Sequence, residues 1–155
     1  MSELETEDSL KWLFNKVDFE LNEKQRKFIV SFINSEKSFV LQGLAGAGKS
    51  TIMSLLKDYY QHSILFTATT GVANLSLPNN IGNGTAHSCL SLAMEPANEL
   101  HYKKTSTTTN KLLGSSDTVQ IIVVDEAFGL NSDNLDLIWR RIERYNKRTS
   151  TRKAR

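Results

Sequence analysis

Two periods of hydrophobic residues alternate along the chain, one typical of helices and one typical of buried strands. Apolar residues three and four positions apart predict a helix over 22–33 and another that begins in the glycine-rich turn at 43–51. Short runs of consecutive apolar residues predict strands over 38–42, 63–68 and 119–126. Because these strands are apolar throughout and alternate with helices, the pattern predicts an α/β fold with a parallel sheet covered by helices on both faces.

The remaining segments are shorter or more polar. The pattern predicts a helix from Gly71, a loop over 76–84 that is rich in Asn, Gly and Pro, and a short helix over 85–92. A last helix is predicted after the capping candidates Asn131 and Ser132. Its expected buried stripe consists of Leu135, Ile138, Trp139 and Ile142.

The turn "GLAGAGKST" at 43–51 matches the pattern G-x-x-x-x-G-K-[ST] and lies between a predicted strand and a predicted helix. Glycines let the backbone turn so that successive N–H groups point at phosphate oxygens, and the helix N-terminus adds positive potential. Lys49 is expected to reach the β and γ phosphates, and the Ser50 hydroxyl to bind Mg²⁺. The turn therefore predicts an ATP site formed by Gly43, Ala45, Gly46, Ala47, Gly48, Lys49, Ser50 and Thr51.

Two acids, Asp125 and Glu126, end the predicted strand at 119–126. The Asp125 carboxylate is suited to hold the water shell of Mg²⁺, and Glu126 to orient or deprotonate an attacking water. The candidate catalytic residues are thus Lys49, Asp125 and Glu126, and the candidate metal ligands are Ser50 and Asp125. The alternative is that the two acids merely end a strand in solvent.

Composition and charge place limits on the class of protein. The chain has 155 residues, 39% of them hydrophobic, a single cysteine and no apolar run as long as a membrane span. These features predict a soluble intracellular domain, in cytoplasm, nucleoid or an infected host cell, without a membrane partner. The net charge is +2, but residues 139–155 hold eight Lys and Arg against one acid. This basic end is suited to nucleic-acid phosphates, or is the solvated end of a helix.

Three further segments resemble motifs of superfamily-1 DNA helicases of the RecD, Dda and Pif type. They are "LNEKQRKFI" at 21–29, "TATTGVANL" at 67–75 and "GTAHSCLSL" at 84–92, and together with the P-loop and the acid pair they follow the family's order. The resemblance covers roughly residues 20–145. It implies a RecA-like P-loop NTPase domain, the first motor domain of an enzyme that couples ATP hydrolysis to 5′-to-3′ movement on single-stranded DNA.

The resemblance also assigns roles to individual residues. It implies that Gln25 contacts the adenine, although Gln25 also stands three residues after Asn22, where a capping box has Glu or Gln. It further implies four residues close to the DNA backbone, namely Thr69, Thr70, Thr85 and His87. The threonines can equally cap the helices that follow them, and the histidine can be structural.

The predicted organisation is an N-terminal extension (1–20), an ATPase domain (21–146) and a basic tail (147–155). Residues 95–118 are too polar and too rich in threonine to form core, and they occupy an interval in which the family often has a strand-separating pin. The His-Tyr pair at 101–102 is suited to stack on a base if this segment is a pin. Its composition also favours a disordered polar loop.

The chain departs from the family in two ways. Ala127, Phe128 and Gly129 stand where the family usually has a small residue, serine and methionine. The family's later motifs and its second motor domain, which supplies an arginine finger, are not found in the sequence. The resemblance therefore predicts a truncated domain that binds ATP and does not unwind DNA alone, since loss of an arginine finger costs about 10³-fold in turnover.

The expected partners are accordingly single-stranded DNA and the missing second motor domain. Two other functions share the same motifs. One is an AAA-type ATPase or helicase loader, which has the same phosphate-binding loop and acid pair. The other is a nucleotide-gated DNA-binding module that does not turn ATP over.

Overall fold

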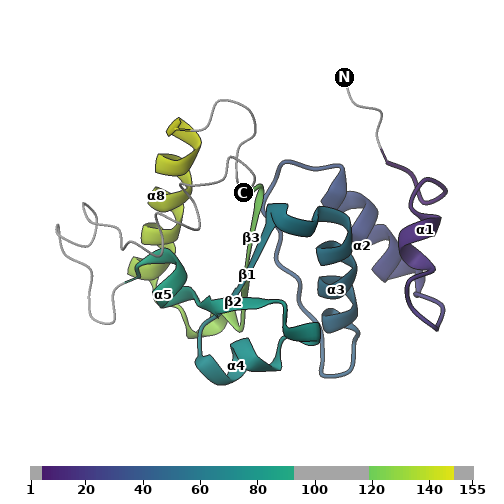
Figure 1. The fold of residues 1–155 in the computed structure, drawn as a ribbon, viewed down its shortest axis with the longest axis horizontal. Coiled ribbons are helices and arrows are strands. Elements are labelled where there is room, and N and C mark those ends of the chain that lie inside the picture. Colours follow the sequence, from purple (N-terminus) through teal and green to yellow (C-terminus); the bar gives the residue numbers. More distant parts are fainter. Residues whose placement is uncertain (1–4, 93–118, 149–155) are drawn as a thin grey trace. The chain divides into compact units, whose positions relative to one another are not determined.

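The computed structural model describes residues 5–92 and 119–148, and the chain divides into two compact units, residues 1–61 and 62–155. The first unit contains α1 (Lys11–Phe14), α2 (Glu23–Ile33) and α3 (Lys49–Tyr60). The second contains β1 (Ile64–Ala68), α4 (Gly71–Ser76), β2 (Gly82–Thr85), α5 (Ala86–Leu90), β3 (Ile121–Asp125) and α8 (Ser132–Arg148) (Figure 1). The predicted pin at 95–118 and most of the predicted basic tail lie outside the described residues.

Helix α2 begins where the sequence predicts it. The Asn22 side chain accepts a hydrogen bond from the Gln25 amide at 3.0 Å, and the Gln25 side chain accepts one from the Asn22 amide at 2.9 Å. This capping box satisfies two backbone donors that the first turn of a helix otherwise leaves open. The apolar side of α2 then buries Ile29 and Phe32, so the predicted helix and its cap are confirmed.

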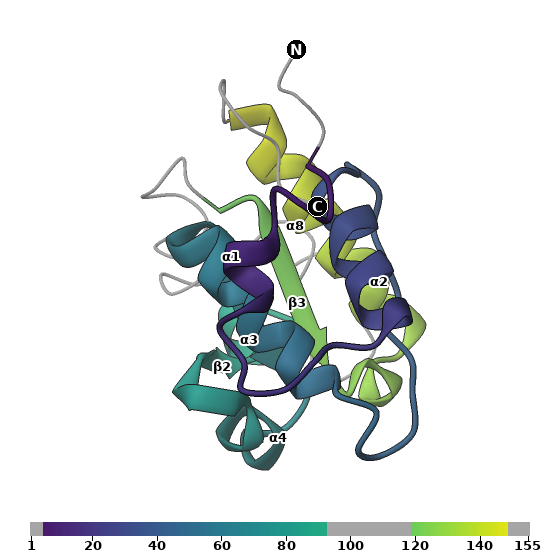
Figure 2. The ribbon, with the colours of Figure 1, turned by 90° about the vertical axis from the view of Figure 1, so that its right-hand side faces the viewer.

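The N-terminal segment packs into the first unit. The Asn34 side chain exchanges two hydrogen bonds with the backbone of Glu5, at 2.8 and 2.6 Å. The ring of Trp12 on α1 stacks on Tyr59 of α3 with 6.5 Å between ring centroids, and the two helices lie side by side (Figure 2). Three leucines of this segment are buried, namely Leu10, Leu13 and Leu21.

The strand predicted over 38–42 is wrong. These residues have no regular secondary structure, and the Val40 side chain is 91% exposed. The Phe39 ring instead packs on α2, 5.9 Å from the Phe28 ring and 5.2 Å from the Phe32 ring. A strand forms only where a neighbouring edge satisfies its N–H and C=O groups, and no described strand pairs with this segment.

The second unit is built on a parallel sheet with the strand order β2-β1-β3 (Figure 1). Every residue of the central strand β1 is buried, which explains its apolar run, and the hydroxyl of the buried Thr67 donates to the Val123 carbonyl at 2.9 Å. Ala68, at the end of β1, is in register with Thr85 of β2 and Asp125 of β3. The predicted α/β P-loop fold with a parallel sheet and surrounding helices is therefore confirmed.

The loop predicted over 76–84 is wrong in its last part, because Gly82–Thr85 forms β2. Two asparagine side chains support this short strand. Asn74 Oδ1 accepts a hydrogen bond from the Gly84 amide at 3.0 Å, and Asn83 Oδ1 accepts one from the Phe66 amide at 2.9 Å. A Cβ at Gly82 would collide with Asn74, so the glycine allows β2 to approach α4.

Helix α5 packs against the sheet through a buried cluster that includes Cys89, Leu90, Leu65 of β1 and Leu137 of α8. Burial raises the pKa of the Cys89 thiol, and a hydrogen bond with Ser88 opposes this shift. Cys89 is therefore part of the core.

Helix α8 begins after Asn131, whose Oδ1 accepts a hydrogen bond from the Asn134 amide at 2.8 Å, so this predicted cap is confirmed. The predicted buried stripe is wrong in part, because Leu135 and Trp139 are 54% and 58% exposed, whereas Ile138 is partly buried against the core cluster. The buried residues of α8 lie on a neighbouring face and are Asn134, Leu137, Arg141 and Tyr145.

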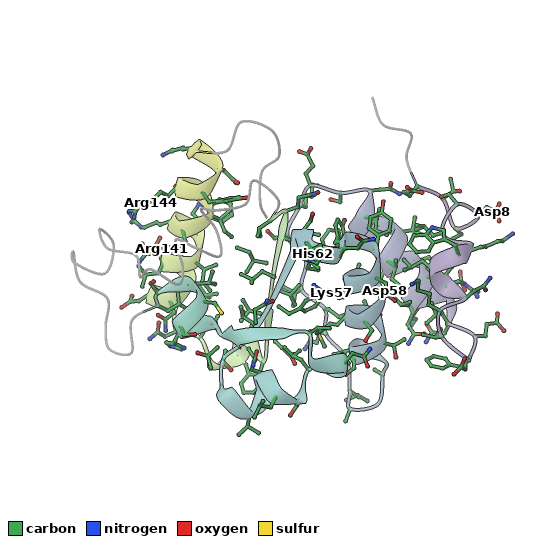
Figure 3. All side chains as sticks on the ribbon, in the orientation of Figure 1. Asp8, Lys57, Asp58, His62, Arg141 and Arg144 are labelled. Carbon is green, nitrogen blue, oxygen red and sulfur yellow. The ribbon has the colours of Figure 1, made fainter. Side chains whose placement is uncertain are left out.

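The buried guanidinium of Arg141 explains the orientation of α8. Its Nε donates to the Leu90 carbonyl at 3.3 Å and an Nη donates to the Ser91 carbonyl at 3.4 Å, at the C-terminal end of α5 (Figure 3). The C-terminal end of a helix carries a partial negative charge, so a cation is favourable there. Burial lowers the pKa of Arg141, and the like charge of Arg144 adds to the effect. No helix in the described part of the chain is long and apolar enough to cross a membrane.

Candidate functional site

The glycine-rich turn of the first unit has the backbone of a phosphate-binding loop. Gly46 and Gly48 have φ of 75° and 83°, in the left-handed region that glycine adopts at little cost. Helix α3 starts at the next residue, Lys49, and among the described residues no side chain caps its first turn. Its first N–H groups therefore face outward at the positive end of the helix, where anions bind.

The Lys49 ammonium lies over the same loop. Its Nζ donates to the carbonyls of Gly43 and Leu44, at 2.8 and 3.0 Å. A positive charge and a row of backbone donors are the groups that phosphate oxygens require, so the loop fits a nucleotide. Of the other predicted nucleotide-binding residues, Ala45 and Ala47 lie in the loop, and Ser50 and Thr51 in the first turn of α3.

Gln25 contacts this loop from α2. Its Nε2 donates to the Ala47 carbonyl at 3.2 Å, while its Oε1 completes the capping box with Asn22. A Cβ at Gly48 would collide with Gln25 Nε2, so glycine is needed there for the amide to approach. The capping alternative for Gln25 is confirmed, and its contact with adenine stays a prediction.

The predicted Mg²⁺ ligands have the chemistry of a phosphate-dependent site. The described residues contain no group of three or more His, Cys, Asp or Glu side chains that would hold a metal by themselves. Mg²⁺ prefers oxygen, and commonly binds through one or two protein ligands together with water and substrate phosphates. Ser50 and Asp125 carry oxygens of this kind, and their binding of Mg²⁺ stays a prediction.

In the second unit, several predicted residues meet at one edge of the sheet. The three parallel strands end at Ala68, Thr85 and Asp125, which are in register. The segments after β1, β2 and β3 therefore all leave the carboxyl edge, where open α/β sheets bind ligands. The structure thus brings together Thr69, Thr70, Thr85, Asp125 and Glu126.

Glu126 has an unusual backbone at this edge. Its φ of 52° and ψ of 39° place it in the left-handed region, which is uncommon for a residue with a side chain. Its amide donates to Asp125 Oδ1 at 3.0 Å, and a 3-10 turn over Ala127–Gly129 follows. Non-glycine residues in this conformation are strained and are frequent at functional sites.

The four predicted DNA-contacting residues have different local roles. Thr70 Oγ1 accepts from the Ala73 amide at 3.1 Å, and Thr85 Oγ1 accepts from the Ser88 amide at 3.3 Å. The capping alternatives for these two threonines are thus confirmed. Thr69 does not cap a helix, because its hydroxyl donates to the Glu126 carbonyl at 3.1 Å. Contacts of all four residues with DNA stay predictions.

Sequence reasoning missed one polar residue beside His87. Asn134 is only 4% exposed, and its Nδ2 lies 3.4 Å from His87 Nε2. Within the described residues, Asn134 Oδ1 has no hydrogen-bond partner. The run "NSDN" at 131–134 reads as a series of helix caps, so no signal in the sequence marks its last residue as buried against α5.

One family model, described as an AAA domain, matches residues 20–150. The match includes both the glycine-rich loop and the acid pair that follows β3. No curated protein matches the chain. AAA domains are nucleotide-binding P-loop ATPase domains, in agreement with the loop described above. The chain belongs to this AAA domain family.

Proposed function

We propose that the chain is the ATP-binding first motor domain of a 5′-to-3′ DNA helicase, with Mg²⁺ as metal and single-stranded DNA as partner. Membership of the AAA domain family supplies the ATPase part of this proposal. The helicase part is supported by the resemblance of residues 21–29, 67–75 and 84–92 to helicase motifs. In such an enzyme a second motor domain completes the DNA groove and the hydrolysis site.

The observation that carries the proposal is the common edge at the ends of β1, β2 and β3. Ala68 is in register with Thr85 and with Asp125, so the segments that resemble DNA contacts border the two acids assigned to hydrolysis. A motor must change its hold on DNA when the nucleotide is hydrolysed. Because the acids and the segments that resemble DNA contacts lie at one sheet edge, a movement of the acids on hydrolysis would shift these segments directly.

The proposal gives each candidate residue a role. Lys49 and the loop amides would hold the phosphates, Ser50 and Asp125 would hold Mg²⁺, and Glu126 would take a proton from the attacking water. Bound ATP supplies the phosphoryl group and Mg²⁺ neutralises its charge. Gln25 is placed against the loop and would contact the adenine.

Single-turnover hydrolysis of radiolabelled ATP by the chain, measured with and without single-stranded DNA at low salt, tests the proposal, because this assay resolves the slow rate expected of a first motor domain by itself. We expect hydrolysis that DNA stimulates, and we expect Glu126→Gln to lower it by about 10²-fold or more while ATP binding survives. Glu143→Gln, on the exposed side of α8, is the matched control. Hydrolysis that ignores DNA, or a Glu126→Gln variant as fast as wild type, would contradict the proposal.

A second measurement separates a DNA groove from the basic tail. Replacement of the Lys and Arg residues of 147–155 by serine should remove the steeply salt-dependent part of oligonucleotide binding. The remaining binding should prefer single strands to duplex and should weaken in His87→Ala, as followed by fluorescence anisotropy. The proposed DNA contacts are wrong if the tail variant loses all oligonucleotide binding and if His87→Ala, made in the protein with its wild-type tail, leaves oligonucleotide binding unchanged.

A further inference from the structure

Thr69 is tied to the turn after β3 through both its backbone and its side chain. Its amide donates to the Asp125 carbonyl at 3.3 Å, and its hydroxyl donates to the Glu126 carbonyl at 3.1 Å. The first bond extends the pairing of β1 with β3 by one residue. The second bond holds the peptide unit directly after the candidate catalytic acid.

That peptide unit belongs to a strained residue. A left-handed conformation costs a non-glycine residue roughly 1–2 kcal/mol, and it persists only where surrounding contacts fix it. The Glu126 carbonyl accepts from the Thr69 hydroxyl and from the Gly129 amide, the latter at 3.0 Å. The Glu126 amide donates to Asp125 Oδ1 at 3.0 Å. Thr69 provides the one side-chain bond to this carbonyl among the described residues.

Gly129 leaves the room that the Thr69 side chain occupies. A Cβ at Gly129 would lie 3.1 Å from Thr69 Oγ1 and 3.2 Å from Thr69 Cβ, closer than ordinary contacts. The superfamily-1 helicases that the sequence resembles usually have a methionine at this position. Glycine at position 129 is therefore both a departure from their pattern and the residue that lets Thr69 lie close. Position 129 therefore offers a second means of disturbing the bond between Thr69 and Glu126.

We propose that Thr69 is a positioning residue for Glu126. This inference rests on the proposed function, in which Glu126 is the general base. By fixing the Glu126 carbonyl, the Thr69 hydroxyl keeps the residue left-handed, and this backbone conformation sets the direction of the carboxylate. Thr69 then serves hydrolysis, whereas the resemblance to helicases assigns it to DNA.

Thr69→Val and Thr69→Ser test the inference. Valine keeps the shape of threonine but removes the hydroxyl, whereas serine keeps the hydroxyl. We expect Thr69→Val to lower kcat about 10-fold to 100-fold, because small misplacements of a catalytic group cost this much. KM for ATP and the affinity for single-stranded DNA should stay within about twofold of wild type, and Thr69→Ser should restore kcat.

Gly129→Ala should lower kcat in the same direction but less, because its methyl group makes a tight contact with Thr69 and forces a small shift of the hydroxyl away from the Glu126 carbonyl. Gly71→Ala is the matched control, since a Cβ at Gly71 meets nothing within 4 Å and its φ is not positive. Circular dichroism melting of all four variants checks that each one folds. The inference is overturned if Thr69→Val has the kcat of wild type, or if this variant loses affinity for DNA instead of kcat.

A spectroscopic readout separates this inference from the assignment of Glu126 as base. In Thr69→Val we expect faster hydrogen exchange at the Gly129 amide and a changed amide–Hα coupling of Glu126, with wild-type values in Thr69→Ser. If Glu126→Gln hydrolyses ATP normally but these signals respond, the proposed function fails and the positioning contact stands. If Glu126→Gln is inactive and the signals ignore Thr69→Val, the inference fails alone.

Discussion

Two left-handed glycines of the phosphate-binding loop allow a direct test of why Gln25 lies against it. Gly46 and Gly48 have nearly the same φ, 75° and 83°. A Cβ at Gly46 would meet nothing within 4 Å, whereas a Cβ at Gly48 would collide with Gln25 Nε2. Alanine at the two positions therefore imposes the same backbone strain, and only at position 48 does it displace a neighbour.

The expected costs follow from these two contributions. Left-handed strain destabilises either alanine variant by roughly 1–2 kcal/mol. In Gly48→Ala the Gln25 amide nitrogen must also shift, which breaks its bond to the Ala47 carbonyl. This bond is worth about 0.5–1.5 kcal/mol, so Gly48→Ala should cost about 0.5–1.5 kcal/mol more than Gly46→Ala.

Urea unfolding of the nucleotide-free protein, followed by Trp12 fluorescence in a Trp139→Phe background, measures this difference. Trp12 stacks on Tyr59, so it reports on the unit that contains the loop. In a Gln25→Ala background the two glycine variants should become equal within about 0.5 kcal/mol, because the displaced group is gone. Equal costs in the presence of Gln25, or a difference that survives Gln25→Ala, would refute the reasoning.

Three further predictions concern single side chains. Lys49→Ala should abolish calorimetric binding of Mg²⁺-ATP with an unchanged circular dichroism spectrum, because backbone amides alone do not neutralise the phosphates; wild-type affinity would contradict the P-loop assignment. Arg141→Met should destabilise the protein to urea by about 1–3 kcal/mol, because the Leu90 and Ser91 carbonyls lose their bonds to the guanidinium, and an unchanged midpoint would show that packing alone orients α8. Cys89 should resist alkylation at pH 8 in the native state and react rapidly in urea, because burial raises its pKa; rapid native labelling would place it outside the core.

Features that depend on neighbouring residues in the sequence were predictable. The caps at Asn22, Thr70 and Asn131 each bond to an amide within three residues, so the sequence contains both partners. The phosphate-binding loop is equally local, because left-handed glycines at 46 and 48 and the start of α3 follow one another directly. The candidate nucleotide-binding residues could for this reason be named from the sequence.

Features that depend on distant contacts could not be predicted in this way. The apolar stripe chosen for α8 has ordinary helical spacing, but Arg141 turns a neighbouring face inward by bonding to carbonyls fifty residues away. The bond between Thr69 and Glu126 also spans fifty-seven positions. Hydrophobic periodicity contains no information on which carbonyls need a donor. It therefore predicts neither the burial of Arg141 nor the bonding partner of Thr69.

The two strand errors have the same cause. Residues 38–42 have the composition of a buried strand, yet they have no regular secondary structure. The segment "GNGT" at 82–85 has a poor strand composition, yet it pairs with β1, because Asn74 and Asn83 bond to backbone groups there and Gly82 permits close approach. Strand formation therefore depends on contacts with distant residues and not on propensity alone. Chemistry located where strands end, as at Asp125 and Glu126, can be anticipated once the parallel arrangement is recognised, even when an individual strand is misassigned.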